Sequence, residues 1–227
     1  MRLRTLSRTS SAPAARCYGA RPRSRRSLEP PLIEIESRLL AAMAAERGHF
    51  RYESGHHGDL WLDLDRLLID AGRTRALASA LAERAVACRP DVVCGPLTGG
   101  AFVAQFVAAE IGAGFVFAER IVAGESVRYR IPGSLRPAVR DQRVLLVEDA
   151  VNAGSVLLAT RQDLLTCGAE LAACASLLAV GDAAARIAAA TGAPFYCLLT
   201  LERGMWPSGA CPLCAAGAPL VDRVPAA

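Results

Sequence analysis

The sequence predicts an α/β fold: a doubly wound, mostly parallel five-stranded sheet with flanking helices, plus a small hood formed by the N- and C-terminal segments. Short apolar runs alternate with segments of 3.6-residue apolar period, which is the pattern of βαβ units. Two of these runs lead directly into loops of small residues that precede a helix. Acidic residues follow one run at the expected strand tip, where open α/β sheets bind ligands.

Charge is distributed unevenly along the 227 residues. Residues 1–28 hold eight of the 26 basic residues and no acid, so the rest of the chain carries 18 basic and 22 acidic residues. The acidic body argues against nucleic-acid binding, and no apolar run reaches the length of a membrane span. We expect a disordered Arg/Ser-rich extension over 1–30, and a domain over 31–222 with a hood (31–70 and 200–222) and a core (71–199).

The cysteines do not indicate a disulfide scaffold, because several of the eight lie in apolar runs where free cysteine packs as a small hydrophobe. A cytoplasmic protein is therefore expected, unless residues 1–30 are an organelle transit peptide; an upstream start codon would leave a similar tail. Cys211 and Cys214 form a Cys-x-x-Cys pair, which supplies only two of four zinc ligands. A packed turn is expected there, and His56 and His57 are expected at a turn or rim.

The positions of the helices and strands are predicted from the spacing of apolar residues and from the Gly and Pro residues that end each element. A helix is expected from Pro31 to about Arg47, where Gly48 ends it, and a strand from Leu60, where leucines alternate with polar and aromatic residues. The tail around Trp206 is expected to reach back to the hood. The remaining expected elements are helices over 73–88, 101–111, 155–167 and 182–191, strands over 91–94, 114–120, 172–180 and 194–201, and a loop or hairpin over 121–142.

Two strand–loop–helix units carry the chemistry. Val144–Val147 form a buried strand that leads into Glu148 and Asp149, then into the loop Ala150–Ser155. Backbone N–H groups at the following helix N-terminus make an anion site, whereas the carboxylates suit sugar hydroxyls or a phosphate-borne metal. Leu97–Gly100 form the second loop, whose glycines allow close backbone approach. The alternative is another nucleotide-binding βα unit.

The stretch Val144–Ser155 resembles the motif that binds phosphoribosyl pyrophosphate (PRPP) in type I phosphoribosyltransferases. Hydrophobic residues, two acids and the final Gly-Ser match that motif, while Asn152 stands where Thr is common. The segment over 48–65, with Gly-x-Phe, Ser-Gly and a strand bearing aromatics, resembles the N-terminal part of orotate phosphoribosyltransferases. Glu53 occupies the position of their base-contacting Lys, and its charge has the wrong sign for orotate.

The resemblance implies Mg²⁺-dependent transfer of a phosphoribosyl group from PRPP to a nucleobase, orotate first, in pyrimidine nucleotide synthesis, with release of pyrophosphate. It also implies a homodimer. The alternatives are a phosphoribosyltransferase for another base, or a PRPP- or nucleotide-binding regulator without turnover, because the family's Lys residues are missing. Mg²⁺ is expected on PRPP, with Glu148 and Asp149 as candidate ligands.

The resemblance also implies the site residues. Val127, Tyr129 and Ile131 alternate, however, which predicts an ordered strand with the neighbouring arginines on its other face; the catalytic role of those arginines therefore stays open. The implied residues are Asp149, Glu148 and Arg120 for catalysis; Ala150, Val151, Asn152, Ala153, Gly154, Ser155, Leu97, Thr98, Gly99 and Gly100 for PRPP; and Ser54, Gly55, Trp61, Leu62, Arg128 and Arg130 for the substrate.

Overall fold

A computed structural model describes residues 32–52, 54–124 and 126–223. The expected disorder of residues 1–30 and the predicted helix start at Pro31 lie outside the described residues, as does Glu53. In the part of the chain that is described, no helix has the length and apolar character needed to cross a membrane.

The core is a six-stranded sheet with five parallel strands, which confirms the predicted fold class; the sixth strand is antiparallel and joins the edge as a hairpin. The apolar runs become strands because each is buried on both faces, as parallel strands require. In spatial order the strands are β5 (Ser126–Arg130), β4 (Gly114–Ala123), β3 (Val92–Pro96), β6 (Arg143–Val151), β7 (Glu170–Val180) and β8 (Phe195–Leu201).

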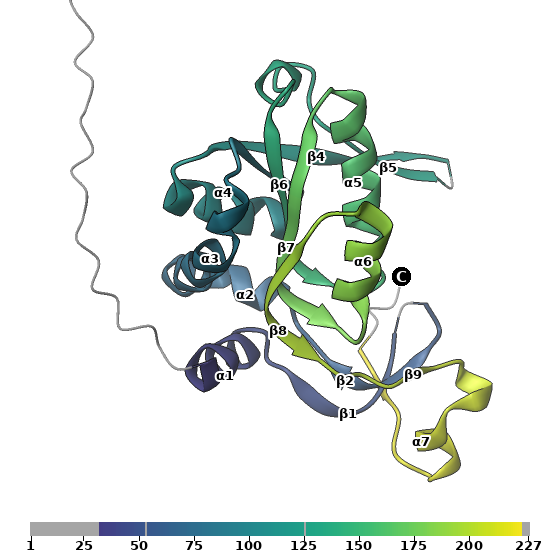
Figure 1. The fold of residues 1–227 in the computed structure, drawn as a ribbon. Coiled ribbons are helices and arrows are strands. Elements are labelled where there is room, and N and C mark those ends of the chain that lie inside the picture. Colours follow the sequence, from purple (N-terminus) through teal and green to yellow (C-terminus); the bar gives the residue numbers. More distant parts are fainter. Residues whose placement is uncertain (1–31, 53, 125, 224–227) are drawn as a thin grey trace, which may run out of the picture. The chain divides into compact units, whose positions relative to one another are not determined.

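Helices cover both faces of this sheet (Figure 1). Leu145 and Val147 of β6 point to the face covered by α3 (Ala71–Ala85) and α4 (Gly99–Ile111), where they join one apolar cluster. Val144 and Leu146 point to the other face, under α5 (Ser155–Thr166) and α6 (Ala183–Thr191). All four side chains are fully buried, so the central strand is fixed between two packed layers.

A second sheet of four short strands forms the hood, and it joins both ends of the described chain. The tail does reach back, as predicted: β10 pairs with β1, and β9 pairs with β2. The strands, in spatial order, are β10 (Val221–Asp222), β1 (Glu46–Arg51), β2 (His57–Trp61) and β9 (Met205–Trp206). The other helices are α1 (Leu32–Ala42), α2 (Asp65–Ile69) and α7 (Pro212–Ala215), with 3-10 turns at Val86–Cys88, Arg136–Ala138 and Ser208–Ala210.

Two predicted boundaries in the hood are wrong. The first helix ends at Ala42 rather than near Arg47, because Glu46–Arg51 pairs with β2 and leaves the helical path. The strand expected from Leu60 onward already ends at Trp61, and Asp65 begins a short helix. At the first boundary tertiary pairing overrides the local apolar pattern.

The segment over 121–142 contains the ordered strand that its alternation predicts. β4 and β5 form an antiparallel hairpin in which Arg120 lies opposite Tyr129. Ile131 is buried after the strand, and its N–H donates to Asp163 Oδ2 at 2.7 Å. The hairpin is therefore tied to α5.

Candidate active site

Two acids lie at the carboxyl end of β6. Burial raises the pKa of Glu148 well above its ordinary value, and the neighbouring Asp149 carboxyl raises it further. Burial also raises the pKa of Asp149, but the Ala150 N–H, which donates to Asp149 Oδ1 at 2.8 Å, opposes that shift. Glu148 Oε2 is buried without a hydrogen-bond partner among the described residues. One acid oxygen of the pair, Glu148 Oε2, is therefore available to a ligand.

The first glycine loop lies directly against these acids. A Cβ atom added to Gly99 would lie 2.0 Å from Asp149 Oδ2, and one added to Gly100 would lie 2.7 Å from Glu148 Oε1. Only glycine allows the backbone to approach the carboxylates so closely. The Leu97–Thr98 peptide bond is cis, and Thr98 precedes α4 without a side-chain cap. The structure thus brings the predicted loop Leu97–Gly100 and the predicted acids together.

The second loop turns sharply from β6 into α5. Its hinge is Gly154, with φ of +81°, where a Cβ atom would lie 2.3 Å from Ile187 Cδ1. No side chain caps the N-terminus of α5, and Ser155 at its start is exposed. The first N–H groups of a helix have no intrahelical partner, so this uncapped terminus can receive an anion.

A cavity of about 440 Å³ lies between this loop and the hood. The core contributes residues from the ends of β6 and β7, and the hood contributes an aromatic wall in which the Tyr52 and Trp61 rings stack at a centroid distance of 6.4 Å. Three predicted substrate residues lie here: Ser54, Trp61 and Leu62. The complete lining is Tyr52, Ser54, Leu60, Trp61, Leu62, Leu64, Ala150, Asn152, Val180, Arg203 and Met205.

Arg203 is the charged cavity residue that the sequence analysis missed; the other lining residues absent from the predicted site are Tyr52, Leu60, Leu64, Val180 and Met205. Its Nη2 donates to Asn152 Oδ1 at 2.8 Å, and its guanidinium carbon lies 5.0 Å from the centroid of the Tyr52 ring. It therefore joins the loop Ala150–Ser155 to the hood and brings a positive charge into the cavity. Asn152 is 51 residues away, and nothing in the local sequence around Arg203 signals this contact.

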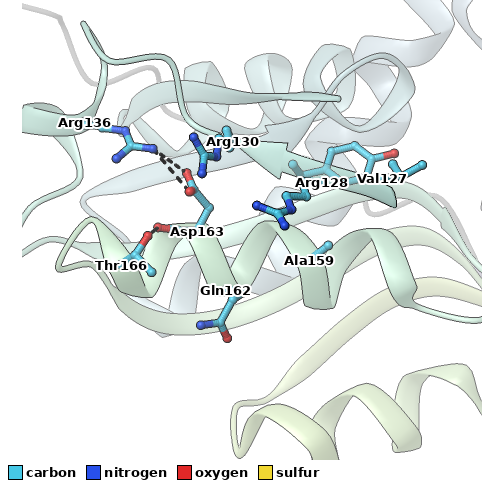
Figure 2. A pocket seen from close by; sticks show the side chains of 9 residues that line it. Val127, Arg128, Arg130, Arg136, Ala159, Gln162, Asp163 and Thr166 are labelled. Atoms are coloured by element: carbon cyan, nitrogen blue, oxygen red, sulfur yellow. Dashed lines mark hydrogen bonds and ion pairs between the residues drawn. The ribbon is translucent and has the colours of Figure 1, made fainter. Parts of the chain in front are cut away.

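Three predicted arginines lie elsewhere. Arg128 and Arg130 line a separate cavity of about 540 Å³ between β5 and α5 (Figure 2). In that cavity Arg136 pairs with Asp163 at 3.4 Å. Arg120 is exposed on β4. Of the described residues that line the 440 Å³ cavity, none is one of these three predicted arginines.

The larger cavity contains no residue of the two glycine loops or the acid pair, so we take the smaller one as the candidate site. Gly55, also predicted for the substrate, is exposed with φ of +77° in the turn before β2. Its N–H donates to the Tyr52 carbonyl at 2.9 Å. Gly55 therefore shapes the turn that presents Tyr52 and Ser54.

The sequence is similar to those of known phosphoribosyltransferases. The family model described as "Phosphoribosyl transferase domain" matches residues 67–191. The orotate phosphoribosyltransferase of Thermus thermophilus is 35% identical over 178 residues, which cover 77% of this chain and 91% of the relative. That of Caldanaerobacter subterraneus subsp. tengcongensis is 30% identical over 175 residues, covering 77% and 87%.

Solved structures agree on the fold. The orotate phosphoribosyltransferase of Mycobacterium tuberculosis in complex with Fe(III) dicitrate superposes with a TM-score of 0.61 at 20% identity, covering 76% of this chain and 97% of that chain. The orotate phosphoribosyltransferase of Aeropyrum pernix superposes with a TM-score of 0.58 at 22% identity, covering 75% and 93%. At these identities the superpositions show the shared fold alone.

Proposed function

This chain belongs to the phosphoribosyltransferase family, and we propose that it transfers the phosphoribosyl group of PRPP to orotate with release of pyrophosphate. One observation carries the proposal: the loop Leu97–Gly100 packs against Glu148 and Asp149, and the loop that directly follows this acid pair lines a cavity that contains an arginine. The names of the relatives support the choice of orotate. Formation of orotidine monophosphate would place the enzyme in pyrimidine nucleotide synthesis.

The 5′-phosphate of PRPP is assigned to the loop Ala150–Ser155. The uncapped start of α5 offers backbone N–H donors, and the exposed Ser155 hydroxyl offers another. The side chain of Asn152 is held by Arg203, so the loop is connected to the cavity where the base is expected. Binding at one site would thereby stabilise the arrangement of the other.

The acids are assigned to the ribose. Glu148 and Asp149 have oxygens that accept hydrogen bonds from sugar hydroxyls, and Asp149 also stabilises positive charge that develops at C1 as the bond to pyrophosphate weakens. The loop Leu97–Gly100 lies against the same acids, so pyrophosphate bound to its backbone would lie next to the ribose. Arg120 is assigned to the pyrophosphate by family resemblance.

Mg²⁺ fits this donor set. Hard carboxylate oxygens are the ligands that Mg²⁺ prefers, and the unpartnered Glu148 Oε2 offers one beside Asp149. When bound together with PRPP, the cation neutralises charge on the departing pyrophosphate. Glu148 and Asp149 are the residues that would hold it, directly or through water.

The base is assigned to the hood side of the cavity. Trp61 supplies an aromatic wall and Leu62 an apolar one, while Arg203 supplies the positive charge that an acidic base requires. The cation missing at Glu53 is thus provided from another part of the chain. Arg128 and Arg130 line the other cavity, so their role toward the substrate stays a prediction from family resemblance. The homodimer is likewise proposed from family resemblance.

The test is a turnover assay with Mg²⁺, PRPP and orotate, following orotate loss together with pyrophosphate release. We expect turnover with orotate and little with uracil, which lacks the carboxylate. Arg203→Gln should raise KM for orotate about tenfold or more, the factor for losing a charged hydrogen bond of about 1.5–3 kcal/mol, with a smaller change in KM for PRPP.

The matched control is Arg140→Gln, because Arg140 is exposed in the turn that precedes β6, away from the cavity. Its kinetics should equal those of the wild type. PRPP binding without turnover of orotate would overturn the orotate assignment, and a screen of other bases would then separate another acceptor from a regulator. Equal KM values for orotate in the wild type and Arg203→Gln would overturn the role of Arg203.

A further inference from the structure

Four metal-ligating side chains converge in the hood, outside the proposed active site. They are His49, His57, Cys211 and Cys214, and the ligand atom of each lies within 4.8 Å of all the others. His49 comes from β1, His57 is the first residue of β2, and the cysteines flank the start of α7. His57 is buried rather than at a rim, so that prediction is wrong; His56 does lie in the turn, where its Nδ1 is 3.4 Å from the Ser54 carbonyl.

Three of the separations between ligand atoms are close to those of a tetrahedral zinc site. With Zn–N of about 2.0–2.1 Å and Zn–S of about 2.3 Å, ligand atoms should be separated by about 3.3 Å for two nitrogens and about 3.5 Å for nitrogen and sulfur. His49 Nε2 and His57 Nδ1 are 3.1 Å apart. Cys214 Sγ lies 3.2 Å from His57 Nδ1, and Cys211 Sγ lies 3.4 Å from His49 Nε2. Side chains that only pack and form hydrogen bonds would not need all four ligand atoms to converge on one point, as they do here.

The surroundings orient the ligands as a metal site does. His49 Nδ1 lies 3.0 Å from the Ala218 carbonyl, to which it can donate only when protonated. That hydrogen bond leaves Nε2 with a free lone pair directed at the cluster, which is the usual arrangement behind a zinc-bound histidine. His49, His57 and Cys211 are at most 6% exposed, so their polar atoms need partners.

The backbone is also shaped for this convergence. The register of β1 against β2 shifts between Arg47 and Phe50, which places a β-bulge at Gly48 and His49. A bulge redirects a side chain, and here both His49 and Phe50 are buried although they are consecutive. Cys211 and Cys214 lie on one turn, closed by the Ala215 N–H that donates to the Cys211 carbonyl at 3.2 Å. Both thiols are free rather than joined in a disulfide.

We propose that His49, His57, Cys211 and Cys214 bind a structural Zn²⁺ ion that holds the hood together. A set of two nitrogen and two sulfur ligands in tetrahedral arrangement selects zinc among common cellular metals. All four positions are filled by protein, which distinguishes a structural from a catalytic zinc site.

The ion would stabilise the roof of the cavity. His57 pairs in register with Trp206, and the next pair joins Gly58 to the cavity residue Met205. Zinc would therefore lock β2, β9 and the segment between β9 and β10 into one unit. This proposal is independent of which nucleobase the enzyme uses, because the zinc content of the protein is measured without an activity assay.

The first experiment measures zinc in tag-free protein, purified without chelator, by mass spectrometry. We expect one zinc per chain, with loss in Cys211→Ser, Cys214→Ser and His57→Asn. The matched controls are Cys197→Ser and His56→Asn, because Cys197 and His56 lie outside the cluster; both should keep full zinc. Wild-type protein without zinc, or full zinc in C211S/C214S, would overturn the proposal.

The second experiment covers variants that fail to fold. Wild-type protein is stripped of metal and titrated with Co²⁺, which should give the intense visible bands of a tetrahedral site together with thiolate charge transfer. Chelator should lower the unfolding midpoint of the wild type and of Cys197→Ser, and leave that of C211S/C214S unchanged. No tetrahedral Co²⁺ spectrum, or a Cys211–Cys214 disulfide in the protein purified under reducing conditions, would contradict the proposal.

Discussion

The acid-and-glycine site of the core and the hood above it are built in different ways. In the core, each loop follows a buried strand within one βα unit, so the strand itself places the loop. In the hood, Arg51 pairs with Asp222, 171 residues away, and Cys211 meets His49 across 162 residues. Pairings this distant in sequence cost more chain entropy to close. The loops of the core are therefore positioned by neighbouring sequence, whereas the hood depends on stabilising contacts between distant segments.

The comparison predicts that the chemistry resides in the core. Asp149→Ala should abolish PRPP binding and lower kcat/KM at least about 10²–10³-fold, the loss for one group that stabilises transition-state charge. Titration calorimetry with PRPP and Mg²⁺ measures the binding. Glu36→Gln, a change at an exposed carboxylate of α1, is the control. PRPP binding of wild-type strength in Asp149→Ala would show that the acids do not belong to the site.

A steric change in the core should be nearly as severe. Gly99→Ala introduces a Cβ atom 2.0 Å from Asp149 Oδ2, so the loop or the acid must move, and displacement of about 1 Å can cost about 10²-fold in rate. Gly133→Ala is the matched control, since its added Cβ meets nothing within 4 Å. Steady-state kinetics decide: equal rates in the two variants would argue that the close approach is unimportant.

The buried acid pair should make the ligand-free core sensitive to pH. The pKa of Glu148 is raised in the folded state by burial, so the folded protein binds more protons than the unfolded chain above pH ~4.5. The free energy of unfolding should therefore fall as pH rises from that value toward the folded-state pKa, by at most about 1.4 kcal/mol per pH unit for one proton.

Denaturant unfolding of the wild type and Glu148→Gln between pH 5 and pH 8, a window of about three units above the ordinary carboxyl pKa, measures this slope. The glutamine side chain cannot titrate in the Glu148→Gln variant, so the free energy of unfolding of that variant should change less with pH. Glu36→Gln should retain the wild-type slope. A slope unchanged in Glu148→Gln would assign the pH dependence to other groups.

The smallest effect is expected from a surface ion pair of the hood. Arg47 Nη1 lies 3.0 Å from Asp59 Oδ2, with side-chain exposures of 57% and 34%. Solvent screening limits such a pair to about 0.2–1 kcal/mol, so Arg47→Ala should shift the unfolding midpoint only slightly. Arg143→Ala, which removes an arginine from a similarly exposed core pair with Glu170, should do the same. A much larger loss for Arg47 alone would mean that polar contacts, rather than metal, hold the hood.

Sequence reasoning succeeded where burial is continuous. The strand over 144–147, the acids after it and both glycine loops lie together as predicted, because a strand buried on both faces leaves little choice of path. It failed where a short segment can form either helix or strand. The sequence predicts Glu46 and Arg47 at the end of a helix, yet they begin β1, which pairs with β2.

By itself, the sequence determined the two strand–loop–helix units, since their apolar runs and glycines act within a few residues, and the edge at which they meet, since parallel strands bring their carboxyl ends to one side of the sheet. Only the tertiary structure decided that Arg203 enters the cavity and that two histidines complete the Cys-x-x-Cys pair. The physical reason is that these contacts join residues 51 to 165 positions apart. No local pattern encodes where such distant segments meet, because that depends on how the whole chain packs.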